Sequence, residues 1–259
     1  MPPSTWKEAR VARGVPATDN RDMTSSPFFG RFPRFSSSSR LPFLLLGLTL
    51  AAWLAGCGDD EDGQLPKPVS IAEARGRNIG STVTLQGFVT VQPGAFQSAI
   101  GDNGFALQDR TAGIYVKLEQ KLNFGLGTQI RVQGTVDEQN GLRILKALPS
   151  QVEQIPGTQI IEPRTVRTGE VNESTEGLLV QVTGNVTQVF RDDSPYGYEL
   201  FINDGSGETQ IYVHLTAGFD RATLEALQAG QSITVVGLTA QYETQYEVAP
   251  RQPSDLKTN

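Results

Sequence analysis

Four short blocks of sequence occur twice, in the same order, in the last two thirds of this 259-residue chain. The pairs are Thr84–Thr90 with Gln181–Thr187, Ile114–Leu118 with Ile211–Leu215, Gly127–Gly134 with Gly230–Gly237, and Pro149–Ser150 with Pro253–Ser254. Matched blocks in one order indicate two copies of one structural unit. We therefore expect two small domains, over residues 69–155 and 160–259.

Apolar and polar residues alternate with a period of two within each copy, which is typical of half-buried strands. In the first copy this pattern predicts five strands, around residues 83–90, 105–107, 114–118, 130–136 and 142–144. Pairs such as Asn140-Gly141 favour tight hairpin turns between them. In the second copy, Leu224 and Leu227 have helical spacing and Gly230 follows, so a short helix is expected between the third and fourth strands.

The order of elements in each copy resembles that of the OB-fold superfamily: three strands, a loop or short helix, and a final two-strand hairpin. Glycines in the strands also fit the resemblance, at Gly87, Gly134, Gly184 and Gly237. The resemblance implies an all-β chain with two tandem five-stranded Greek-key barrels. Strongly bent barrel strands need positions without a side chain, which suits these four glycines. The pair is also similar to OB modules beside secreted nucleases and phosphoesterases, although no nuclease domain accompanies it here.

The sole cysteine, Cys57, ends the run Leu54-Ala55-Gly56-Cys57, after basic residues and an apolar stretch over 41–56. This run resembles the lipobox of bacterial lipoproteins, which implies cleavage before Cys57 and lipidation of that cysteine. Residues 1–56 would then be a signal peptide with extra N-terminal residues, and Met23 a plausible true start. The alternative is a short membrane anchor or a buried helix, but 16 residues fall short of the roughly 20 that span a membrane.

Residues 57–68 contain four consecutive acidic residues, glycines and prolines, and predict a flexible acidic tether that binds no metal. The lipoprotein resemblance implies a lipid-anchored protein of the cell envelope. In the enterobacterial scheme, an aspartate directly after the lipidated cysteine retains a lipoprotein in the inner membrane; Gly58 stands there, so the outer membrane is expected in preference to the inner one. Without residues 1–56 the chain has 15 basic and 25 acidic residues, a formal charge of −10. A single cysteine also excludes a disulfide within the chain.

OB-folds bind ligands on the outward face of their second and third strands and in the bordering loops. If Ile114 and Val116 point inward, Tyr115 and Lys117 face outward, beside Gln108 on the preceding strand. The second copy has an equivalent set of outward aromatic and polar residues. The ligand-binding candidates are Gln108, Tyr115, Lys117, Arg131 and Arg143 in the first copy and Phe201, Asn203, Tyr212 and His214 in the second. Stacking of a base on tyrosine beside a cation would suit single-stranded nucleic acid.

Simpler explanations exist for these residues. Tyrosine is a favoured residue at half-exposed cross-strand positions, and the only histidine, His214, suits an ordinary surface position. The formal charge is +2 over residues 69–150 of the first copy and −9 over residues 170–259 of the second. A charge of +2 is weak support for a polyanionic ligand. Asp204–Glu208 favours a hairpin turn over a metal loop.

The chain contains no Gly-rich phosphate loop, nucleophile elbow or Cys/His metal spacing, so we expect neither an enzyme nor a cofactor. The sequence predicts a non-catalytic binding or scaffolding module, with an envelope protein or glycan as partner. The first alternative is binding of single-stranded DNA through the strand face of the first copy. The second is an accessory module of an envelope hydrolase or nuclease system.

Overall fold

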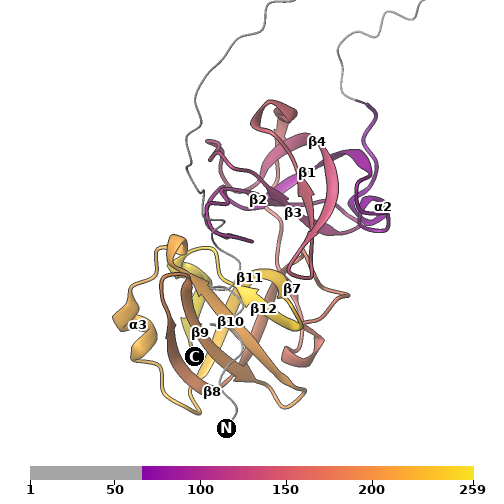
Figure 1. Cartoon of the computed structure of the whole chain (residues 1–259). Helices are drawn as coiled ribbons and strands as arrows, with labels where there is room; N and C mark the ends of the chain where they lie inside the picture. Colours follow the sequence, from indigo (N-terminus) through magenta and orange to yellow (C-terminus); the bar gives the residue numbers. More distant parts are fainter. Residues whose placement is uncertain (1–65) are drawn as a thin grey trace, which may run out of the picture. The chain divides into compact units, whose positions relative to one another are not determined.

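The computed structural model describes residues 66–259, so Cys57, the predicted signal peptide and most of the predicted tether lie outside the described residues. Two β-sheets follow one another along the chain, with short helical turns between their strands (Figure 1). Within this range no helix combines the length and the apolar character needed to cross a membrane.

The first sheet is a closed barrel with OB topology. Its strands have the order β1-β2-β3-β5-β4, a further pairing of β1 with β4 closes the ring, and β3 and β5 run parallel. Strand β6 pairs with β4 in antiparallel orientation and is not part of the closed ring. The elements are α2 (Ile71–Arg75), β1 (Thr82–Val91), β2 (Phe105–Gln108), β3 (Gly113–Lys117), β4 (Thr128–Gln139), β5 (Leu142–Lys146), η1 (Pro149–Gln151) and β6 (Val152–Thr158).

The second sheet repeats this order as β8-β9-β10-β12-β11, closed by the pairing of β11 with β8. Strands β7 and β13 extend it at β8 and β11. The elements are β7 (Arg164–Thr165), η2 (Thr168–Glu170), β8 (Leu179–Asp193), β9 (Gly197–Asn203), β10 (Glu208–His214), η3 (Leu215–Ala217), α3 (Arg221–Glu225), β11 (Ser232–Tyr242), β12 (Gln245–Ala249), η4 (Pro253–Asp255) and β13 (Leu256–Thr258). The all-β class and the two OB barrels predicted from the sequence are confirmed.

Each barrel encloses its own apolar core, built by the predicted alternation. Ile114 and Val116 of β3 are fully buried in the first core, and Ile211 and Val213 of β10 occupy the same places in the second. Because successive strand residues point to opposite faces, Tyr115 and Tyr212 lie on the outer faces of their barrels, as expected.

The glycines of the bent strands lie where neighbouring backbones approach closely. A Cβ on Gly87 would lie 2.7 Å from the carbonyl oxygen of Gln108, and one on Gly237 would lie 2.6 Å from that of Ala249. Real side chains do not tolerate such distances, which explains why both copies keep glycine there.

The helix and turns predicted for the connections are also present. Asp220 caps α3 by accepting a hydrogen bond from the backbone N–H of Ala222, and Leu224 is fully buried in the second core. Asn140 and Gly141 have φ angles of 53° and 90°, the positive values that a tight hairpin between β4 and β5 requires.

Helix α2 and the edge strands β6, β7 and β13 were not predicted. Strand β6 is mostly exposed and contains Pro156, so it shows neither alternation nor a core-facing run. Its counterpart β13 follows Pro253-Ser254 just as β6 follows Pro149-Ser150, so the fourth repeated block marks the 3₁₀ turn before each edge strand.

The two barrels share a third buried cluster formed by their outer faces. From the first barrel it contains Val91, Ala106, Tyr115, Leu142 and Ile144 on the strands and Ala95 and Phe96 in the β1–β2 loop. From the second barrel it takes Leu238, Ala240 and Ala249. The two copies are therefore packed against each other through apolar side chains.

This contact joins different faces of the two copies. The pairing of the second and third strands makes Glu199 and Tyr212 of the second copy equivalent to Ala106 and Tyr115 of the first. The pairing of the last two barrel strands makes Glu247 equivalent to Ile144. In the other direction, Thr135, Asp137 and Lys146 are equivalent to Leu238, Ala240 and Ala249. The side chains that each copy contributes to this cluster are thus mostly apolar, whereas the equivalent positions of the other copy are mostly polar.

Candidate ligand-binding site

The contact between the barrels includes two of the predicted ligand-binding residues of the first copy. Tyr115 is fully buried, and its hydroxyl donates a hydrogen bond to the carbonyl oxygen of Phe96 at 3.0 Å. The Gln108 side chain accepts a hydrogen bond from the N–H of Leu179 in the second barrel at 3.0 Å. The expectation that Tyr115 is an accessible surface aromatic is wrong, because the second copy supplies the apolar partners that cover it.

Tyr212 and His214 are likewise buried, with 0% and 3% of their surface exposed, so the expected surface position of His214 is also wrong. The Tyr212 hydroxyl donates to Oδ2 of Asp193 at 2.8 Å, and the rings of Tyr212 and His214 lie 4.9 Å apart. The His214 ring lies 4.6 Å from that of Phe96. His214 thus joins the aromatic contact between the copies.

The remaining candidates do not converge on one place. Phe201 and Asn203 are half-buried, and the Asn203 side chain accepts hydrogen bonds from the turn that follows it. Arg131 lies opposite Glu153 of β6. The backbone N–H of Arg143 donates to Glu176 of the second barrel at 3.1 Å. Their role in ligand binding stays a prediction.

Lys117 borders a hollow on the first barrel. Its Nζ donates to Oε1 of Gln139 at 2.8 Å, and nearby Lys146 forms an ion pair with Asp137. Lys117, Lys146 and the exposed Leu148 line a cavity of about 540 Å³ there. The carboxylates of Asp137 and Glu119 balance the two lysines, so this hollow presents no excess of positive charge.

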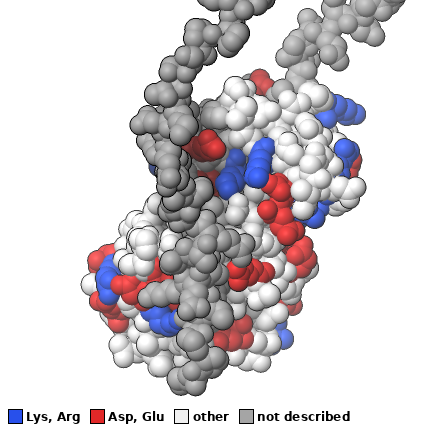
Figure 2. All heavy atoms as spheres, in the orientation of Figure 1, with Lys and Arg blue, Asp and Glu red and all other residues white. Residues whose placement is uncertain are grey.

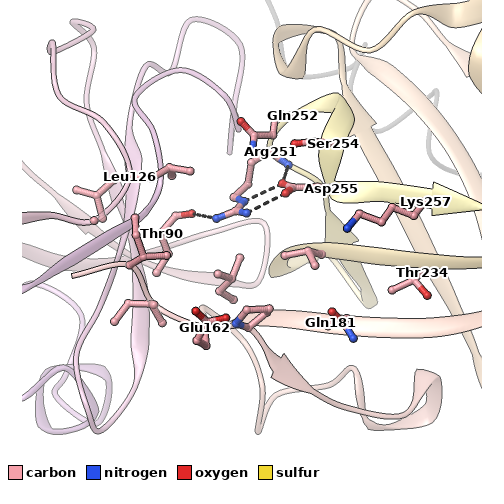
Figure 3. Close-up of a pocket in the computed structure, with 17 residues that line it drawn as sticks. Thr90, Leu126, Glu162, Gln181, Thr234, Arg251, Gln252, Ser254, Asp255 and Lys257 are labelled. Atoms are coloured by element: carbon pink, nitrogen blue, oxygen red, sulfur yellow. Dashed lines mark hydrogen bonds and ion pairs between the residues drawn. The ribbon is translucent and has the colours of Figure 1, made fainter. Parts of the chain in front are cut away.

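A second cavity, which we call the inter-barrel pocket, has walls from both barrels and from the segment that connects them (Figure 3). Its volume is about 370 Å³, within the range of roughly 300 to 1,000 Å³ usual for small-molecule sites. The connecting segment contributes Ile160–Pro163. The barrels contribute Val89, Thr90, Leu126, Gly127, Leu179, Gln181, Thr234, Val236, Arg251, Gln252, Ser254, Asp255 and Lys257.

Arg251 fixes one wall of the inter-barrel pocket. Its guanidinium donates through Nε and Nη2 to the two carboxylate oxygens of Asp255, each at 2.8 Å. Its Nη1 donates across the boundary to the carbonyl oxygen of Thr90 at 3.0 Å (Figure 3). A bidentate pair of this kind holds its geometry well and satisfies its own charge, so it positions the wall without adding net charge.

Sequence reasoning did not find this pocket. Its polar residues come from distant strands, and its shape depends on how the copies pack. One sequence feature could have pointed to it: Arg251 and Asp255 are four residues apart, directly after a strand, and flank the repeated Pro253-Ser254.

The described residues hold no group of three or more His, Cys, Asp or Glu side chains that could bind a metal ion. The turn Asp204–Glu208 connects β9 and β10, as the hairpin interpretation predicted. Hydrogen bonds from Ser206 and from Thr168 lower the pKa of Asp204, so this carboxylate is already engaged by protein donors.

Charges of both signs are interspersed over the described surface visible in Figure 2, with no extended basic patch on that face. Phosphate backbones are bound by clustered Lys and Arg side chains. The visible face therefore lacks the electrostatic footprint of a nucleic-acid binder.

No protein-family model matches the chain, and no curated protein matches it. Among solved structures it is similar to the p204 HINb domain, with 15% identity over 70% of this chain and 98% of that one and a TM-score of 0.36. It is similar to the Ifi202 HINa domain, solved with double-stranded DNA, with 10% identity over 69% and 98% and a TM-score of 0.37. An OB domain of MM0293 from Methanosarcina mazei has 15% identity over 38% and 86% and a TM-score of 0.32. The OB assignment rests on the strand order described above.

Proposed function

We propose that this protein is a non-catalytic binding module of the bacterial cell envelope, anchored by a lipid on Cys57, with its ligand held in the inter-barrel pocket. One observation carries the binding role: both copies and their connecting segment together form a pocket with convergent polar groups. Such a pocket is the default location for a small ligand. The face that isolated OB-folds use is, in the first barrel, occupied by the second barrel.

The non-catalytic role is supported by what the pocket contains. Among the described residues that line it, the charged ones are Arg251 and Asp255, which neutralise each other, and Lys257 and Glu162, which lie at exposed positions. A general base or nucleophile needs a neighbour that shifts its pKa or accepts its proton. The described residues that line the pocket include no histidine and no cysteine.

The binding role is tested by thermal unfolding of the full chain, purified in detergent, with panels of neutral saccharides, uncharged peptides and oligonucleotides. A ligand at one hundred times its Kd stabilises a protein by about 2.7 kcal/mol, which raises the unfolding temperature measurably. We expect one panel to do so, and we expect Gln181→Ala with Thr234→Ala to remove the effect. Failure of all three panels, or chemical conversion of the bound compound, contradicts the proposal.

Lipid anchoring is tested separately by labelling cells with radioactive palmitate. We expect the full chain to carry the label and to sediment with membranes. The Cys57→Ser variant removes the only thiol and is expected to lose both properties. An unlabelled wild-type chain would show that residues 41–57 are not a lipoprotein signal.

The alternative of single-stranded DNA binding has its own outcome in the oligonucleotide panel. Binding that weakens steeply with salt and is lost in Lys117→Ala with Arg143→Ala would favour it over the pocket. The formal charge of the first copy, +2 over residues 69–150, is small, so we expect no such binding at physiological salt.

A further inference from the structure

We propose that the inter-barrel pocket binds a small, uncharged, hydroxyl-rich ligand of about the size of a disaccharide, and that the Thr90 hydroxyl is one of its hydrogen-bonding partners. This inference rests on the proposed binding function and names the chemical class of the ligand.

The charges of the pocket select against ions. Arg251 and Asp255 pair through two hydrogen bonds, and the third guanidinium nitrogen of Arg251 donates to the Thr90 carbonyl oxygen. Lys257 and Glu162 lie at exposed positions, where water screens their charges. An ion inside the pocket would lose its hydration without gaining a desolvated, unpaired counter-charge, which is costly.

The uncharged lining has the composition that suits a sugar. Hydroxyl and amide groups are supplied by Thr90, Gln181, Gln252 and Ser254, which can both donate and accept hydrogen bonds. The Thr234 hydroxyl also lines the pocket and already forms hydrogen bonds with Thr183 and Asn259. Aliphatic side chains such as Val89, Ile161 and Leu179 form the surfaces between them. A saccharide presents hydroxyl groups at its edges and C–H groups on its faces. The hydroxyls can pair with the polar side chains of the pocket, and the C–H faces can pack on the aliphatic side chains between them.

The hydroxyl of Thr90 is the most specific feature. Thr90 is 1% exposed, it lines the pocket, and its Oγ1 has no hydrogen-bond partner within residues 66–259. A buried hydroxyl without a partner is unfavourable for stability, and a bound molecule in the pocket that Thr90 lines would supply the missing hydrogen bond. Three other threonines, Thr84, Thr209 and Thr239, share the unpartnered buried hydroxyl but do not line the pocket.

Thr84 provides a matched control, because it lies on the same strand as Thr90 and is also buried, with 3% exposed. Thr90→Val and Thr84→Val each replace an unpartnered hydroxyl by a methyl group. Neither variant is expected to unfold the protein, since removing an unpaired polar group from the interior does not break a protein hydrogen bond.

The experiment is calorimetric titration of the full chain in detergent with maltose, cellobiose and N,N′-diacetylchitobiose, and with glucose 6-phosphate as the charged probe. We expect at least one neutral disaccharide to bind and the phosphate to bind more weakly. Thr90→Val should weaken disaccharide binding by roughly three- to tenfold, the worth of one hydrogen bond, and Thr84→Val should leave it unchanged.

Three results overturn the inference: no neutral disaccharide binds, the charged probe binds best, or Thr90→Val and Thr84→Val behave alike. If uncharged peptides or oligonucleotides stabilise the protein through Gln181 and Thr234 while disaccharides do not bind, only the ligand class is wrong. If no panel stabilises it, the binding function itself fails.

Discussion

Arg75 in α2 of the first barrel donates a hydrogen bond through Nη2 to Oε1 of Glu176, in the loop before β8 of the second barrel, at 2.9 Å. The Glu176 side chain is fully buried and that of Arg75 is 14% exposed. Oε1 of Glu176 also accepts the backbone N–H of Arg143. One carboxylate thus connects a helix and a strand of the first copy to the second copy.

Arg75→Ala is therefore expected to lower the free energy of unfolding by about 3 kcal/mol, because it leaves the Glu176 charge buried without its partner. Urea unfolding of the full chain measures this. The control is Arg77→Ala, which removes an exposed pair with Glu73 and should cost less than about 1 kcal/mol. Equal effects would show that Glu176 is not held by Arg75.

Glu176 also predicts a pH dependence of stability. Burial raises the pKa of Glu176 above its ordinary value of 4.5, although Arg75 opposes the shift. The folded state then binds this proton more tightly than the unfolded state, so the contribution of Glu176 to stability is present below pH 4.5 and is lost as the pH rises through the raised pKa. Compared with Glu176→Gln, the wild-type protein should lose unfolding free energy over that rise. A difference that grows in the opposite direction would mean that the ion pair dominates.

Gly113→Ala tests the close packing of the two copies. A Cβ at this position would lie 1.9 Å from the carbonyl oxygen of Gly177, so the backbones must move apart. We expect a loss of about 1 to 3 kcal/mol, as for other overpacked sites. Faster proteolysis within residues 156–163 is also expected. Gly125→Ala, where a Cβ meets nothing within 4 Å, should change neither measurement.

Tyr115 should behave as an inaccessible phenol. Burial, with a contribution from nearby Asp102, raises the pKa of Tyr115 well above its ordinary value of 10.0. In an alkaline titration followed by absorbance, the native curves of the wild type and of Tyr115→Phe should therefore coincide. Tyr246→Phe, in contrast, should remove a component with a pKa of about 12, a value raised by burial and by the hydrogen bond to Glu173. Native titration of Tyr115 near pH 10 would show that the two barrels separate in solution.

The sequence was sufficient for the interior of each barrel and insufficient for the boundary between them. Alternation at Ile114 and Val116 reports burial in a core that each copy forms alone. The burial of Tyr115 depends on Leu238 and Ala240, which lie more than 120 residues further along the chain, and no local pattern connects them. The inter-barrel pocket could not be predicted for the same reason, because Thr90 and Arg251 come together only through that contact.

The contact between the two copies is asymmetric, because each copy contributes a different face. When two similar units meet through different faces, the same contact can in principle add a third and a fourth unit and so build a filament. In this chain, the side chains of the contact do not recur on the equivalent faces: Glu199 and Glu247 stand in place of Ala106 and Ile144, and Asp137 and Lys146 stand in place of Ala240 and Ala249. The apolar contact is therefore specific to this one pair of faces, and the duplication has produced two barrels that are similar inside and different outside.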